Sequence, residues 1–217
     1  MSFALDGMDT ALLSHIAQHP GVFIEAGAYD GLTQSNTALL EFSYGWRGLL
    51  VEPVPELAER CAANRPGSVV EQAALVPPDH EGDLVSMTYC NRSSIVHGAR
   101  GGPDEDAAWI ETCRALPDQR GIEPRHLTVP ARTLSSIVEK HRISRIDLVS
   151  LDLEGYEAPA LRGLDFERHR PRLLLVEISN DRDAVESVLE PWYDAIAELS
   201  DHRDQEPAWY DVLYRAR

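Results

Sequence analysis

Carboxylate side chains stand at the ends of short apolar runs that are typical of β-strands. They are, in chain order, Glu25, Glu52, Asp152, Glu154 and Glu177. In an open α/β sheet, ligands bind outside the carboxyl ends of the strands, so we expect these acids to meet at one edge of a sheet. Because carboxylates only accept hydrogen bonds, such an edge favours a ligand that carries positive charge or several hydroxyl groups.

The stretch GVFIEAGAYDGLTQSN, residues 21–36, contains the turn that follows the first of these runs. A dinucleotide site would place glycines against a pyrophosphate, and an acid about 20 residues further on against the ribose. Glu52, which lies 25 positions after Gly27, meets the second requirement, but Glu25 would repel a pyrophosphate. S-adenosylmethionine has no phosphate and carries a sulfonium and an ammonium. The turn therefore predicts this cofactor and disfavours a nicotinamide-dependent dehydrogenase.

Each acid also has a purely structural interpretation, which the sequence leaves open. Glu25 or Asp30 alone could stabilise the start of a helix through the helix dipole. Glu52 could serve the turn before Pro53, and Glu157 is interpreted as an acid in the first turn of a helix. The coincidence of a strand, a glycine turn, a helix, a second strand and an acid favours the cofactor site.

Around these acids the sequence predicts strands that alternate with helices. The predicted strands are 22–26, 48–53, 68–75, 146–153, 172–179 and 210–216. The predicted helical or mixed segments are 9–19 with Asp9 as its cap, 33–43, 55–64, 131–142, a short helix ended by Gly163, and an amphipathic helix at 184–199. Near-continuous apolar strands between helices predict a doubly wound α/β fold, in which a mostly parallel sheet has helices on both faces.

The length of 217 residues suits a single domain that spans 1–217. Segment 83–128 interrupts the alternation of strands and helices, and it is rich in Gly, Ser and charged residues. Long irregular stretches in compact domains are usually functional, so we expect a lid or insertion at 83–128. A surface insertion without a role is the alternative.

Charge and hydrophobicity exclude several classes of function. The net charge of -16, from 36 acids and 20 bases, repels nucleic acid. No apolar run approaches the ~18 residues that a membrane helix needs, so no membrane partner is expected. The N-terminal residues carry no export signal, and a cytoplasmic location is expected.

The three cysteines lack the spacing of a zinc site and are expected to be reduced thiols. They are Cys61, Cys90 and Cys113.

Four stretches are similar to the FkbM family of S-adenosylmethionine-dependent methyltransferases, which has a Rossmann-like fold. They are FIEAGAYDG, GLLVEPVPELAERCAANRP, IDLVSLDLEGYEAPALRGL and LLLVEIS. The resemblance covers residues 20–180, and its most specific part is the D-x-E-G-x-E motif at 152–157. The turn of this family commonly opens with Asp, whereas this chain has Glu25.

The resemblance implies which residues hold S-adenosylmethionine. The implied residues are Glu25, Ala26, Gly27 and Asp30 on the methionine side, Glu52 and Pro53 at the ribose, Gln72, Ala73 and Ala74 near the adenine, and Ser93 and Ser94 over the cofactor. Asp152 and Glu154 would face the transferred methyl group, and Asp152 would also contact the cofactor.

The resemblance also implies O-methylation, with a hydroxyl of a small molecule, sugar or natural product as the acceptor. Asp152 is the first candidate for the general base or substrate orienter and Glu154 the second. His97 is a third candidate, although a surface loop histidine is the simpler interpretation. Asp152, Glu177 and Asn180 could form an oxygen-rich site for Mg²⁺, or these acids could bind substrate hydroxyls instead.

Two other functions stay open at this point. They are a methyltransferase that acts on a protein or peptide, and a non-catalytic module that binds S-adenosylmethionine. The small-molecule or glycan acceptor is expected to be recognised by residues 83–128 and 180–208, which contain no recognisable motif. A free edge of the sheet also leaves a homodimer open.

Overall fold

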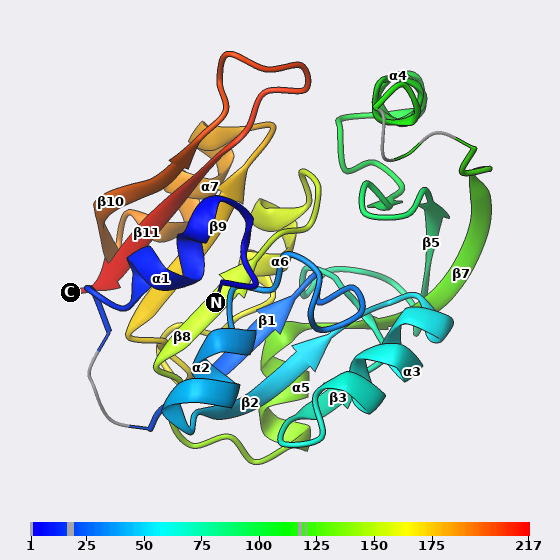
Figure 1. Cartoon of the computed structure of the whole chain (residues 1–217). Helices are drawn as coiled ribbons and strands as arrows, with labels where there is room; N and C mark the ends of the chain where they lie inside the picture. Colours follow the sequence, from blue (N-terminus) through cyan, green and yellow to red (C-terminus); the bar gives the residue numbers. More distant parts are fainter. Residues whose placement is uncertain (1, 17–19, 117–118, 120) are drawn as a thin grey trace.

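The computed structural model of the protein describes residues 2–16, 20–116, 119 and 121–217. These residues form a seven-stranded sheet with the order β10-β11-β9-β8-β1-β2-β3 (Figure 1). Its strands are β1 (Val22–Ala26), β2 (Arg47–Val51), β3 (Val69–Glu71), β8 (Leu148–Leu151), β9 (Leu173–Ile178), β10 (Tyr193–Asp201) and β11 (Tyr210–Ala216). Neighbouring strands pair in parallel from β9 to β3, whereas β11 is antiparallel to both of its neighbours.

Helices cover both faces of this sheet. The described helices are the 3-10 helix η1 (Leu5–Gly7), α1 (Met8–Leu12), α2 (Ala38–Tyr44), α3 (Pro55–Asn64), α4 (Pro103–Arg114), α5 (Leu134–Lys140), α6 (Glu157–Arg162) and α7 (Arg182–Leu189). Successive strand residues point to opposite faces, so Ile24 and Leu49 pack in a core with α5, α6 and α7, while Phe23 and Leu50 pack in a second core with α1 and α2. The strands are continuously apolar for this reason, and the predicted doubly wound α/β fold is confirmed.

The segment expected to be an irregular lid or insertion contains most of a second, smaller sheet. This sheet has the order β4-β7-β5-β6, from β4 (Ala74–Leu75), β5 (Leu84–Tyr89), β6 (Ile95–Val96) and β7 (Arg125–Arg132). In Figure 1, β5 and β7 stand to the right of the main sheet, and α4 lies above them. Segment 83–128 therefore contains two complete strands, part of a third and a helix, and its action as a lid stays a prediction.

The predicted strand 68–75 is wrong as a single element. It forms β3 and β4, which belong to different sheets, and the chain passes from one sheet to the other at Gln72 and Ala73. The segment 131–142 is also divided, since β7 continues to Arg132 and α5 begins after Thr133, whose side chain accepts a hydrogen bond from the Ser136 amide.

The predicted helix 184–199 is wrong in its second half. Helix α7 ends at Leu189, and Pro191, which has no N–H and clashes with the preceding turn, separates it from β10. Pairing with β11 then holds 193–201 as the edge strand of the sheet. The apolar residues of this segment follow a helical period in sequence, but the proline prevents the helix from continuing.

The first predicted helix, 9–19, is shorter than expected. Helix α1 covers only Met8–Leu12, and residues 17–19 lie outside the described residues. Asp9 is not the cap of this helix: its carboxylate accepts hydrogen bonds from the Phe3 amide at 2.7 Å and the Ser2 hydroxyl at 2.6 Å. Asp9 thus fixes the N-terminal segment.

Two expectations from composition can be compared with the structure. The cysteines are unpaired and buried, as expected for reduced thiols. Among the described helices, none combines the length and the apolar composition that a membrane span requires.

Candidate functional site

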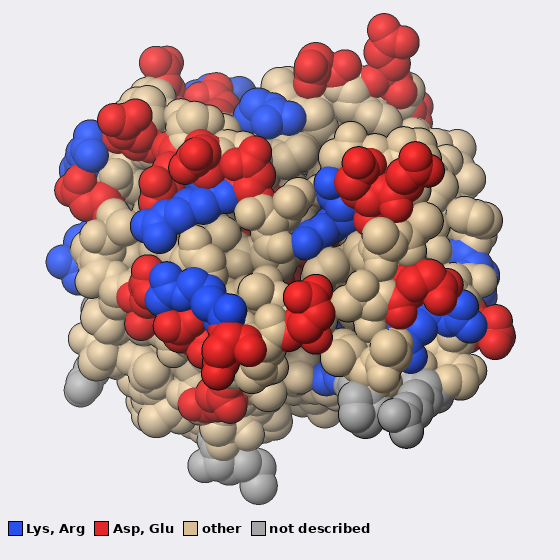
Figure 2. All heavy atoms as spheres, turned by 90° about the horizontal axis from the view of Figure 1, so that it is seen from above, with Lys and Arg blue, Asp and Glu red and all other residues tan. Residues whose placement is uncertain are grey.

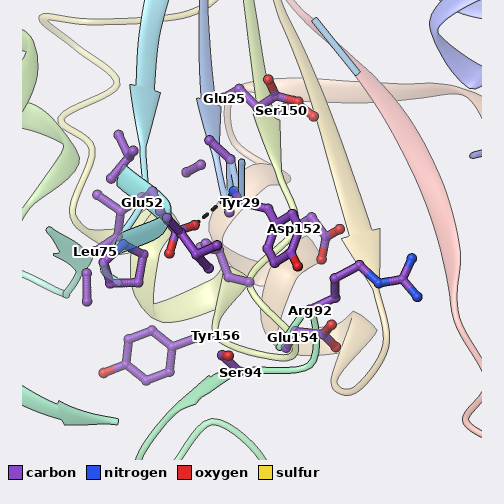
Figure 3. Close-up of a pocket in the computed structure, with 18 of the residues that line it drawn as sticks. Glu25, Tyr29, Glu52, Leu75, Arg92, Ser94, Ser150, Asp152, Glu154 and Tyr156 are labelled. Carbon is purple, nitrogen blue, oxygen red and sulfur yellow. Dashed lines mark hydrogen bonds between the residues drawn. The ribbon is translucent and has the colours of Figure 1, made fainter. Parts of the chain in front are cut away.

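A pocket with about 980 Å³ of empty space opens where the parallel strands end, at the point where the strand order reverses. The turn after β1, the end of β2, residues 73–75 and the segment after β8 line it, and the second sheet and loop 91–94 close it. Ligands of doubly wound folds bind at this switch point. In Figure 3, Glu52 and Leu75 lie on one side of the pocket, and Asp152, Glu154 and Arg92 lie on the other.

Gly27 brings the two central strands of this pocket into contact. Its φ is +81°, and a Cβ at this position would lie 1.9 Å from the carbonyl oxygen of Asp152. The Gly27 amide donates to the carbonyl of Val51 at 3.1 Å, which ties the turn to β2 as well. Only glycine fits both the conformation and the close approach. Gly27 was predicted to line the methionine side of the cofactor; it lines the pocket, and its contact with a cofactor stays a prediction.

Glu52 is held rigidly at the end of β2. Its carboxylate accepts hydrogen bonds from the amides of Tyr29 and Val54, both at 2.9 Å, and the Tyr29 bond is the dashed line in Figure 3. Each carboxylate oxygen has a second lone pair that a hydroxyl of a ligand can use. Burial raises the pKa of Glu52 to about 7, against the lowering effect of these two amides.

Glu25 lines the same pocket but is engaged by the protein itself. Its carboxylate accepts hydrogen bonds from the Ser35 hydroxyl, the Asn36 amide and the Thr37 hydroxyl at 2.8, 2.8 and 2.6 Å. The fully buried guanidinium of Arg65 lies 3.6 Å from it. Glu25 therefore shapes the loop before α2, and its direct contact with a cofactor stays a prediction.

The two acidic residues that follow β8 face the pocket. Burial, followed by the charges of Asp211 and Glu157, raises the pKa of Asp152 to about 8. Solvent reaches the Asp152 side chain through the pocket that it lines. Because protein surrounds this pocket, the carboxyl is poorly solvated although it is accessible, and its pKa is raised. Burial and Asp152 hold the pKa of Glu154 well above its ordinary value. Carboxyls that retain a proton near neutral pH can act as proton acceptors in catalysis once ionised.

The third acid of the D-x-E-G-x-E motif has a different task. Glu157 begins α6, as predicted, and its carboxylate accepts hydrogen bonds from the amides of Leu153 and Gly155 at 2.7 and 3.2 Å. Gly155 has a φ of +99° and Glu154 a φ of +55°. Glu157 thus holds the tight turn that presents Asp152 and Glu154 to the pocket.

Most of the predicted cofactor residues lie together in this pocket, and three do not line it. The predicted residues that line it are Glu25, Ala26, Gly27, Glu52, Pro53, Ala73, Ala74, Ser94 and Asp152. Asp30 instead accepts from the Leu32 and Thr33 amides at 3.0 and 2.8 Å and shapes its own turn. Gln72 is exposed and donates to the Pro53 carbonyl, while Ser93 lines an adjoining pocket.

His97 and Asn180, two further predicted residues, are not brought to the cofactor pocket. The Nε2 atom of His97 lies 3.0 Å from the Thr88 hydroxyl, in a separate surface depression that also contains His126. The Asn180 side chain donates to the Ala99 carbonyl at 3.1 Å. The proposed proton acceptors in the pocket are therefore Asp152 and Glu154.

The sequence reasoning missed the residues with which the second sheet closes the pocket. The Tyr29 hydroxyl donates to the Asn91 side chain at 2.6 Å, and the Ser94 hydroxyl donates to the Asn91 carbonyl at 2.6 Å. Met87 and Val96 add an apolar wall from β5 and β6. Tyr29 and Asn91 could have been found, since they adjoin the singled-out turn and Ser93-Ser94, but no motif marks Met87 or Val96.

A second pocket adjoins the first and shares part of its lining. Gln34, Asn36, Arg92, Asp152 and Glu154 border both. The rest of the second pocket comes from η1, α1, Ser93, α4 and the residues after it, β9, β11 and the loop between β10 and β11. Helix α4 is fixed here by Arg100, which donates to the carbonyls of Glu154 and Ser179 and lies 3.8 Å from the ring centre of Trp109. Two adjoining pockets with shared acids suit a cofactor and an acceptor that must meet.

The chain was compared with known families and solved structures. A family model described as the methyltransferase FkbM domain matches residues 25–205. A protein of the NADB-Rossmann superfamily from Streptococcus agalactiae aligns with 100% of this chain and 70% of its own length, at 11% identity and a TM-score of 0.54. This likeness shows the fold.

Two further solved structures are similar at lower scores. A TehB-like S-adenosylmethionine-dependent methyltransferase from Corynebacterium glutamicum aligns with 97% of this chain and 88% of its own, at 11% identity and a TM-score of 0.48. An RNA methyltransferase from Salinibacter ruber, solved with S-adenosyl-L-homocysteine, aligns with 98% of this chain and 91% of its own, at 14% identity and a TM-score of 0.47. Among curated proteins, none matches the sequence.

Proposed function

The chain belongs to the FkbM family of methyltransferase domains, and we propose that it methylates a hydroxyl group of a small molecule, sugar or natural product. Family membership confirms the resemblance found in the sequence and makes the protein an S-adenosylmethionine-dependent methyltransferase. The hydroxyl acceptor is the proposed part.

One observation carries the proposal: a single pocket has a ribose-type acid at one end and two acids of raised pKa at the other. Glu52 and Asp152 lie on opposite sides of it (Figure 3). The side of the pocket that holds Glu52 is also apolar, at Ala74 and Leu75, and suits a flat base. The residues present therefore fit S-adenosylmethionine, with the ribose hydroxyls at Glu52 and the reactive end at Asp152.

When bound, S-adenosylmethionine supplies an electrophilic methyl group on a positively charged sulfur. The chain's own residues then orient the acceptor and take its proton. Asp152 accepts the proton that the hydroxyl loses, since a carboxylate whose pKa is about 8 is a stronger base than an ordinary aspartate. Tyr29, Met87 and Val96 also line the pocket and add apolar surface to it.

Magnesium does not fit the residues predicted for it. Asn180 is exposed, its side-chain amide donates to the Ala99 carbonyl, and it does not line the pocket that holds Asp152 and Glu177. Within the ranges that the structure describes, no three His, Cys, Asp or Glu side chains are placed to hold one metal ion. We therefore derive no step through a metal, and activity that survives exhaustive chelation is the expected result.

The experiment is methyl transfer from methyl-labelled S-adenosylmethionine to a panel of hydroxylated small molecules and sugars. We expect a labelled O-methyl product whose rate falls by about 10²–10⁴ in Asp152→Asn, the usual contribution of a general base. A label on the nitrogen or carboxylate of a peptide would support a protein methyltransferase instead. Binding of the cofactor with no acceptor turned over would support a non-catalytic module.

A further inference from the structure

The second pocket, which we call the acidic pocket, is defined by Asp152, Glu154, Glu177, Asp211, Trp109 and Gln119. Glu177 ends β9, Asp211 belongs to β11, and Trp109 lies on α4. It contains about 1030 Å³ of empty space, which includes open solvent at its mouth. Because it shares Asp152 and Glu154 with the cofactor pocket, a molecule bound in it would reach the methyl-transfer end of that pocket.

Three carboxylates in the acidic pocket accept no hydrogen bond from the described residues, although the charge of Arg92, which lines the same pocket, acts on Asp152 and Glu154. Across the described ranges, no hydrogen bond or ion pair reaches the side chains of Asp152, Glu154 or Glu177, whereas Asp211 accepts from the Ser200 hydroxyl at 2.6 Å. Burial, followed by Asp152 and Glu154, holds the pKa of Glu177 well above its ordinary value. Like charges brought together in this way resist ionisation until a cation joins them.

Two buried amide oxygens add to this surplus of acceptors. Gln119 is 2% exposed and Asn36 is 7% exposed, and among the described residues neither side-chain oxygen has a hydrogen-bond partner. Both residues line the acidic pocket. An unpaired buried polar group is costly, so these oxygens point to a ligand that donates hydrogen bonds. The indole N–H of Trp109 is also unpaired there and suits an oxygen of the same ligand.

From these observations we propose that the acidic pocket binds the acceptor, and that the acceptor carries a protonated amine in addition to the hydroxyl that is methylated. The proposal rests on the proposed function, because it takes this pocket as the acceptor side. An ammonium supplies three N–H donors and a positive charge that favours ionisation of the carboxyls, whereas a neutral polyol would leave that ionisation unfavourable.

The charge of the whole protein favours the same class of ligand. The net charge is -16, and Figure 2 shows acidic side chains spread over the face seen from above, with basic ones among them. Such a field attracts small cations toward the protein. A divalent metal is the less suitable cation, since the described side chains form no metal-holding group. An amino sugar or another amino polyol is the matching acceptor class.

The test uses full-length protein saturated with S-adenosylhomocysteine near neutral pH. Glucosamine, galactosamine and serinol are titrated in, each beside its N-acetylated form, and binding is measured by calorimetry and by the shift of the thermal midpoint. We expect the amines to bind and their N-acetylated forms to bind at least about tenfold more weakly, a factor that corresponds to about 1.4 kcal/mol. Equal binding of the two forms, or binding of neither, would overturn the proposal.

The variant Glu177→Gln removes one ionisable carboxyl from the acidic pocket without changing the size of the side chain. Amine affinity should fall about tenfold in this variant, while Glu167→Gln, a matched change at an exposed residue outside both pockets, should bind as the wild type does. Unchanged amine affinity in Glu177→Gln would overturn the proposal. Thermal unfolding of the unliganded variant checks its fold, and failure of the wild type to bind S-adenosylhomocysteine would instead count against the proposed function.

Discussion

Cofactor affinity should depend on pH through Glu52. The ribose hydroxyls donate hydrogen bonds, so they bind the ionised carboxylate better than the protonated one. With a pKa of about 7, about nine-tenths of Glu52 is ionised at about pH 8 and about 3% at about pH 5.5. If binding requires the ionised form, affinity for S-adenosylhomocysteine falls about thirtyfold over this range.

The raised pKa of Glu52 also makes the stability of the unliganded protein depend on pH. A carboxyl whose pKa is higher in the folded than in the unfolded protein makes the folded state bind more protons between the two pKa values, so Glu52 lowers stability as pH rises from about 4.5 to about 7. The shift corresponds to about 3 kcal/mol. The hydroxyls of a bound cofactor donate hydrogen bonds to the ionised Glu52 and so offset part of the free energy that its ionisation costs. Cofactor affinity therefore rises with pH.

Calorimetric titration of S-adenosylhomocysteine across this pH range is the assay. Glu52→Gln cannot ionise, so it should bind more weakly at about pH 8 and lose most of the pH dependence. Glu59→Gln, an exposed residue on the neighbouring helix α3, is the matched control and should follow the wild type. A wild-type affinity that does not change with pH, or the same pH dependence in Glu52→Gln, would refute the reasoning.

Three further predictions concern the residues that shape the site. Gly27→Ala should destabilise the protein by more than the ~1–2 kcal/mol of a left-handed conformation, since its Cβ also meets the Asp152 carbonyl; denaturant unfolding within about 0.5 kcal/mol of wild type would argue against this contact. Arg65→Met leaves the buried Glu25 and Glu41 carboxylates without their cation, so denaturant unfolding should show a loss of about 3–5 kcal/mol; unchanged stability would count against the ion pairs. Asp152→Asn should flatten the fall in thermal midpoint as pH rises from about 4 to about 8, because the folded pKa is raised and the charged form is the unfavourable one; a midpoint that falls as steeply as in the wild type would contradict the raised pKa.

The cofactor side of the site could largely be predicted from sequence, because local order determines it. Glu52 follows a buried strand at a fixed distance from Gly27, and parallel strands bring both to one edge. The D-x-E-G-x-E motif likewise places Asp152 and Glu154 one turn before α6. These positions are set by residues that are adjacent on a strand and its turn, so they do not depend on contacts with distant parts of the chain.

The sequence could not show which carboxylates are bonded within the protein, or which residues form the acceptor side. Both depend on contacts between residues that are far apart in the chain. Glu25 is engaged by Arg65, which lies 40 positions further along the chain, and by the loop before α2. The acidic pocket assembles Trp109, Glu177 and Asp211 from three separate elements. The helical period of 184–199 was misleading for a different reason: Pro191 ends the helix, and pairing with the next strand, β11, then holds 193–201 as β10.

Calorimetric titration of the full chain with S-adenosylhomocysteine, beside NADH, tests the cofactor site most directly. We predict saturable binding of S-adenosylhomocysteine that is lost in Glu52→Ala and kept in Glu59→Ala, with no binding of NADH. Binding of NADH without S-adenosylhomocysteine, or wild-type affinity in Glu52→Ala, would contradict the site between Glu52 and Asp152.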